Sequence, residues 1–74
     1  MVRDAWVHTH SIRLPSGEEA LVTRVVAPDG RIGYGYSLAL DATASRHMAE
    51  RFAAEKLPAE VEAAIASIRW LPAP

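Results

Sequence analysis

At Asp41 the spacing of the apolar residues changes from every second residue to about every 3.6 residues, and this change constrains the fold more than any other feature. Alternate residues of a strand share a face, whereas a helix returns to the same face after three or four residues. Strands are therefore expected first and helices second. A chain of 74 residues without cysteine has room for a single domain, residues 1–74, with no disulfide to support it.

Three strands are expected before Asp41, at about residues 5–14, 20–27 and 31–38. The second strand is rich in valine, and the Pro-Asp-Gly sequence at residues 28–30 that follows it is typical of a tight turn. A Pro-Ser-Gly sequence at residues 15–17 separates the first two strands. Short turns join antiparallel neighbours, so these segments predict a three-stranded antiparallel meander.

Two helices are expected after the change, at about residues 42–57 and 59–70. Asp41 or Thr43 can cap the first by accepting a hydrogen bond from a free backbone N–H, and Pro58 suits the first turn of the second. Apolar residues recur at helical spacing in the second segment: Val61, Ala64, Ile65 and Ile68. The order of elements predicts an α+β fold in which both helices pack on one face of the sheet.

The other face of such a sheet would be bare and partly apolar. Trp6, Ile32 and Tyr34 are the residues we expect at an interface there, because exposed apolar patches favour association. The free energy gained by burying so small a core also exceeds the entropic cost of ordering the chain by only a little. We therefore expect a homo-oligomer or a complex with a second protein.

Charge narrows the range of partners. Eight basic and nine acidic residues give a formal net charge of -1, and the two signs are interleaved along the chain without forming a basic block. Nucleic acid and anionic membranes are therefore not expected partners. The sequence has no apolar run of the roughly 18 residues that span a bilayer and no apolar signal segment at its start, so a cytoplasmic location is the default expectation.

His8 and His10 are the residues most suggestive of chemistry, because two imidazoles on one face of a strand can share a metal ion. The sequence offers one further histidine, His47, in the first predicted helix. The simpler interpretation is that both are polar residues on a partly solvated strand, and no metal site is predicted.

The Gly-Tyr-Gly-Tyr sequence at residues 33–36 lacks the third glycine and the strand–helix context of a dinucleotide-binding loop. Glycines within a strand indicate a close approach of backbone, so we expect another element to pack against Gly33 and Gly35 while the tyrosines face the other way. The serines lack the setting of a nucleophile, and no acid–base pair stands out. No catalytic residue is predicted.

The segment LVTRVVAPDGRIGYGYS at residues 21–37 resembles the N-terminal capping domain of the enolase superfamily, in particular the mandelate racemase and muconate lactonizing enzyme group. The shared features are a valine-rich strand, an Asp-Gly turn and a strand ending in Gly-x-Gly-Tyr before a loop of small residues and helices. The resemblance covers about residues 5–57.

In that family the cap closes over the mouth of a modified (β/α) barrel and contributes to substrate selection. The resemblance implies that Tyr36, Ser37 and Leu38 line one substrate-covering loop and that residues 14–19 form the other. The acid–base residues and the carboxylates for Mg²⁺ belong to the barrel in such enzymes, so no cofactor is expected in this chain.

Two classes of function compete. The chain is either a stand-alone or split capping domain that docks on a barrel subunit or on itself, or a small homo-oligomeric binding module with no enzyme context. The first predicts a barrel protein that lacks its own cap, whereas the second predicts self-association that is independent of Mg²⁺. A third alternative, a metal-dependent enzyme built on His8 and His10, requires metal in the purified protein.

Overall fold

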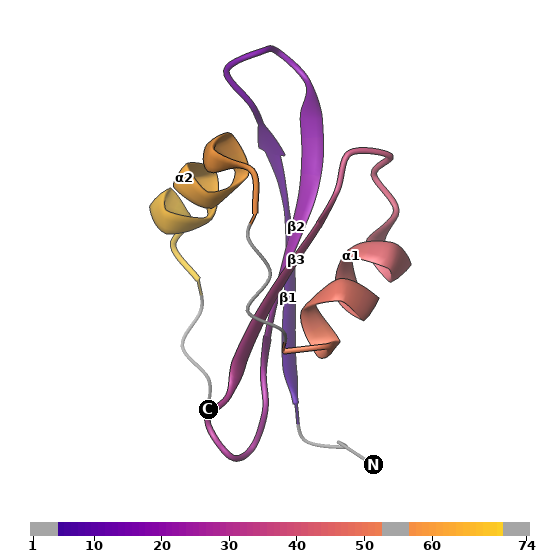
Figure 1. The fold of residues 1–74 in the computed structure, drawn as a ribbon, viewed down its shortest axis with the longest axis vertical. Helices are drawn as coiled ribbons and strands as arrows, with labels where there is room; N and C mark the ends of the chain where they lie inside the picture. Colours follow the sequence, from indigo (N-terminus) through magenta and orange to yellow (C-terminus); the bar gives the residue numbers. More distant parts are fainter. Residues whose placement is uncertain (1–4, 53–56, 71–74) are drawn as a thin grey trace.

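The computed structural model describes residues 5–52 and 57–70, which form three antiparallel strands followed by two helices (Figure 1). The elements are β1 (Trp6–Arg13), β2 (Glu19–Val26), β3 (Ile32–Ser37), α1 (Ala42–Glu50) and α2 (Ala59–Ser67). The sheet order is β1-β2-β3. The predicted α+β arrangement is confirmed, and each strand boundary lies within one residue of its expected position.

Both helices are shorter than predicted. Helix α1 ends at Glu50 because Phe52 adopts a left-handed backbone conformation, with φ 50°, and donates its N–H to the carbonyl of Ala49. Residues 53–56 of the first predicted helix lie outside the described residues. Helix α2 ends at Ser67 because Ile68 is extended, with φ −75° and ψ 137°.

The strand register divides the side chains of the sheet between two faces. Thr23 pairs with Thr9 on one side and Gly35 on the other, whereas Val22 pairs with His10 and Tyr36. Because alternate residues point to opposite faces, these two rows mark the two sides of the sheet. We call the side of Thr23 the α1 face and the side of Val22 the α2 face, after the helix that each carries.

Helix α1 lies directly on the backbone of β3, on the side where the two glycines predicted the close approach of another element. A Cβ atom at Gly33 would collide with the backbone carbonyl of Ala49, and one at Gly35 with that of Ser45. The close approach also brings the hydroxyl of Ser45 to 2.8 Å from that of Thr23, which itself lies 3.1 Å from the hydroxyl of Thr9. Three hydroxyl groups therefore connect β1, β2 and α1 beneath the helix.

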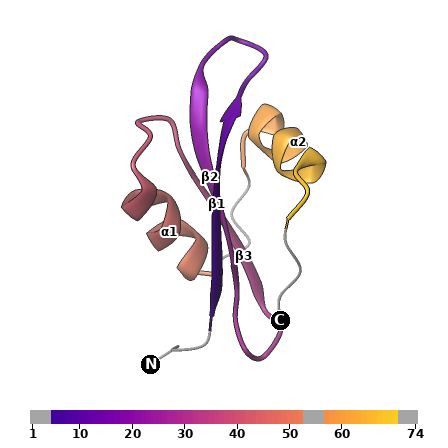
Figure 2. The same cartoon turned by 180° about the vertical axis from the view of Figure 1, so that it is seen from behind.

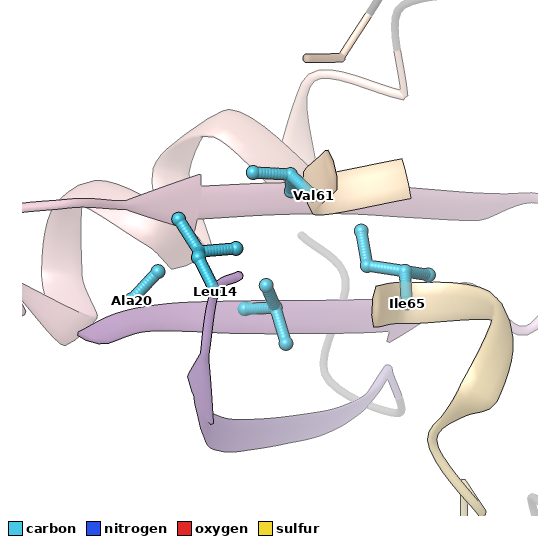
Figure 3. Close-up of a cluster of buried hydrophobic side chains, with 5 residues drawn as sticks. Leu14, Ala20, Val61 and Ile65 are labelled. Carbon is cyan, nitrogen blue, oxygen red and sulfur yellow. The ribbon is translucent and has the colours of Figure 1, made fainter. Parts of the chain in front are cut away.

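Helix α2 packs on the opposite face, so the expectation that both helices share one face is wrong (Figures 1 and 2). Val61 and Ile65 of α2 join three residues of the hairpin in a buried cluster (Figure 3): Leu14, Ala20 and Val22. The physical reason lies in β2, which is buried on both sides. A second helix on the α1 face would leave Val22 and Leu14 in water.

The β2–β3 turn is closed by backbone and side-chain hydrogen bonds. Ala27 donates to the carbonyl of Arg31 at 2.8 Å, and Gly30 takes the positive φ of 92° that the turn requires. The backbone N–H of Arg31 donates to Asp29 at 3.0 Å and holds the pKa of that carboxyl below its ordinary value. Within residues 5–52 and 57–70, no helix has the length and apolar character needed to cross a membrane.

Candidate functional site

The β1–β2 and β3–α1 loops lie at the same end of the sheet, because β1 and β3 run in the same direction (Figure 1). We call this end, residues 14–18 and 38–41, the loop end. Its exposed large apolar side chains are Leu38, which is 51% exposed, and Leu40, which is 47% exposed. Two leucines that remain this exposed beside a formed core offer apolar surface to another molecule.

The backbone around the two leucines is firmly held. The buried hydroxyl of Ser37 accepts a hydrogen bond from the N–H of Asp41 at 3.0 Å, and the carbonyl of Ser37 accepts from Leu40 at 3.4 Å. Of the two predicted cap residues, Asp41 is the one that caps α1: its carboxylate accepts from the N–H of Ala44 at 3.1 Å. Both leucines are thus presented by a loop anchored at the strand end and at the helix start.

Leu40 has a left-handed backbone conformation, with φ 58°. A β-carbon is unfavourable there, and such strain is concentrated at functional positions in proteins. The sequence carries no signal for this conformation, since glycine or asparagine is the residue that usually marks it.

Replacing Leu40 with glycine should raise the free energy of unfolding by about 0.5–1 kcal/mol, because relief of the left-handed strain exceeds the entropy that glycine costs. Leu38 is the matched control, since it is equally exposed and is not among the residues with positive φ. Leu38→Gly should lower stability by about 0.5–1 kcal/mol. Urea denaturation measures both changes. A loss of stability in Leu40→Gly would show that the backbone of Leu40 is not strained.

The structure separates the three residues that the resemblance assigned to substrate covering. Leu38 points outward at the loop end, whereas Ser37 is buried and holds the loop. Tyr36 lies on the α2 face, half-buried against the cluster of Val61 and Ile65. Of the three, Leu38 has the exposure that contact with another molecule requires, and Leu40 is a neighbour that the sequence did not identify.

The opposite end of the α2 face carries a second apolar surface. The register aligns Trp6, Val26 and Ile32 across the three strands, and we call them the apolar row. Ile32 is 45% exposed, and Tyr34 in the next row is 36% exposed. The α2 cluster does not include these residues, so the helix covers only part of this face. The predicted interface residues Trp6, Ile32 and Tyr34 therefore lie together.

Trp70 lies between the apolar row and the α2 cluster. Its ring meets that of His10 edge-on at 4.8 Å and that of Tyr34 at 6.1 Å, and the guanidinium of Arg24 lies 5.9 Å from its centre. The indole N–H donates to the carbonyl of Ile65 at 3.2 Å. These contacts tie the segment after α2 to the sheet.

His8 and His10 occupy the α2 face in adjacent rows, opposite Arg24 and Val22. The ring of His10 is packed against Trp70. Among residues 5–52 and 57–70 no group of three potential metal ligands occurs, so the geometry brings no third ligand to the two imidazoles.

No protein-family model, curated protein or solved structure matches this chain, so the likeness to the enolase capping domain stays a prediction.

Proposed function

We propose that this chain is a cap-like module that docks its loop end on a separate barrel subunit and does no chemistry of its own. The observation that carries the proposal is the pair of exposed leucines, Leu38 and Leu40, on an anchored loop. The resemblance adds that the loops after the first and third strands face the barrel mouth in enolase-type caps. Both loops lie at one end of this sheet.

Docking would remove both leucines from water. Full burial of a leucine side chain is worth about 1.5–3 kcal/mol, so two half-exposed leucines contribute roughly that amount together. The loop is already ordered by Ser37 and Asp41, so little entropy is lost on binding. A lid of this kind would act by keeping water from the barrel's site, and any Mg²⁺ would be held by the barrel.

The test is co-expression with an enolase-type barrel protein that lacks its own cap, beginning with the neighbouring reading frame. A stable complex with one copy of this chain per barrel subunit is expected. Leu40→Asp should weaken it at least about tenfold, because a carboxylate replaces an exposed leucine that docking would bury. Ile32→Asp is the matched control, since Ile32 is equally exposed at the opposite end of the sheet. The proposal is refuted if none of the barrel proteins tested binds, or if both variants weaken binding equally.

A second candidate is a self-associating binding module with no enzyme context. The apolar row favours it, since Trp6, Val26 and Ile32 are neighbours across the three strands and lie beside the row of the exposed Tyr34. In this case Ile32→Asp lowers self-association and Leu40→Asp does not, with or without Mg²⁺. Native mass spectrometry reads stoichiometry and bound metal together, and so also tests the third alternative, a metal held by His8 and His10.

A further inference from the structure

The outer edge of β1 is open in the part of the chain that the structure describes. Strand β1 is an edge strand of eight residues, and α1 packs chiefly on β3 and β2. Edge strands in proteins that stay monomeric commonly carry proline, a bulge or a central charge that prevents pairing. Strand β1 has no proline, pairs with β2 in an unbroken register, and has one Lys, Arg, Asp or Glu residue, Arg13 at its end.

The hydrogen bonds of the hairpin show which backbone groups face this edge. Leu14 donates its N–H to the carbonyl of Glu18 at 2.8 Å, in continuation of the pairing of Arg13 with Glu19. In an antiparallel pair the residues that bond to the neighbouring strand alternate with those that do not. His8, His10 and Ile12 therefore bond towards β2. The N–H and C=O groups of Val7, Thr9 and Ser11 point away from it.

We propose that β1 pairs with β1 of a second copy of this chain, antiparallel and about a two-fold axis at Thr9, to form a continuous six-stranded sheet. Thr9 then exchanges two backbone hydrogen bonds with Thr9 of the second copy, and Val7 exchanges two with Ser11 of the second copy. With the symmetric pair, about six backbone hydrogen bonds form.

The side chains in this register favour a second copy over an unrelated strand. Trp6 lies opposite Ile12 of the second copy on the α2 face, and both are half-buried in the single chain. Aromatic and aliphatic pairs across strands are stabilising, as is the pairing of Thr9 with itself. Arg13 falls opposite Ala5 and His8 opposite His10 of the second copy, so no two Lys, Arg, Asp or Glu side chains face each other. The segment is thus complementary to itself.

This interface is separate from the loop end and from Ile32, so the β1 pairing can be tested independently of the proposed function. Sedimentation at micromolar concentrations should show a monomer–dimer equilibrium for the unmodified chain. Ser11→Pro should abolish the dimer, because proline removes an outward N–H and places its ring at the pairing edge. The Ser11 side chain is exposed, and the substitution removes no bond to β2, so circular dichroism should be unchanged.

Ser11→Ala is the matched control and should dimerise as the unmodified chain does. Leu40→Asp and Ile32→Asp should also dimerise, which separates this edge from the docking surfaces above. A monomer at every concentration overturns the proposal. A folded Ser11→Pro variant that still dimerises overturns the proposal as well, because the second chain is then bound at a surface other than the edge of β1.

Single cysteines test the register directly, because the chain has none of its own. Thr9→Cys places two thiols on a hydrogen-bonded pair with Cα atoms about 5.5 Å apart, within reach of a disulfide. Ser11→Cys places them roughly 13 Å apart along the strand, beyond that reach. Under mild oxidation Thr9→Cys should form a covalent dimer at least about ten times faster than Ser11→Cys. Equal rates overturn the pairing, even if Ser11→Pro fails to fold.

Discussion

Replacing Gly35 with alanine is expected to lower the free energy of unfolding by about 3 kcal/mol, at the upper end of the range for overpacked sites. A Cβ at this position collides with the carbonyl oxygen of Ser45 and lies 2.7 Å from the backbone N of Ala49. Both contacts are backbone atoms of α1, so no side-chain rotation relieves them. The helix must move away from β3, and the bond between Thr23 and Ser45 is lost with it.

Gly17→Ala is the control for this measurement. Gly17 has φ 93° and open space around its Cα, so alanine there meets only the left-handed penalty of about 1–2 kcal/mol. Urea denaturation of both variants separates steric from conformational cost. If Gly35→Ala lowers the free energy of unfolding no more than Gly17→Ala does, the close approach of α1 to the sheet is contradicted.

The order of the elements could be predicted because each depends on a local pattern. The turn glycines and the valine-rich strand defined the meander, and Gly33 and Gly35 predicted the side on which another element would approach. The start of α1 could also be predicted from a local signal, since the side chain of Asp41 caps the helix. Periodicity and turn chemistry are sufficient for features of this kind.

The side of the sheet on which α2 packs could not be predicted in the same way. The spacing of Val61 and Ile65 shows that α2 has an apolar face, but that face fits either side of a sheet equally well. The relevant signal lay in β2, where residues 20, 22, 23 and 25 are all buried and the alternation typical of a half-exposed strand is missing. A central strand buried on both sides requires a cover on each.

The loop end was predicted only in part, for a different reason. The resemblance pointed to Leu38 through its place after the third strand, and the structure shows it exposed. The left-handed conformation of Leu40 arises from the bonds that Ser37 makes across the loop, and no residue type marks it. Strain imposed by tertiary contacts on an ordinary residue has no sequence signature.

Ile65→Ala should lower the free energy of unfolding by about 2–4 kcal/mol, because it removes one of the two buried side chains through which α2 holds the sheet. The carbonyl of Ile65 also accepts the indole N–H of Trp70, so loosening α2 should free that ring from His10. In a Trp6→Phe background, emission from Trp70 should shift to longer wavelength.

The same variant tests on which face α2 lies. Amide chemical shifts should change at Val22 and Tyr36, on the α2 face, and remain nearly constant at Gly33, which contacts α1. Ala66→Ser, at an exposed position of the same helix, is the control and should leave stability and emission unchanged. Chemical-shift changes centred on Gly33 would place α2 beside α1. That placement would leave the Val22 side of β2 without the cover that its burial requires.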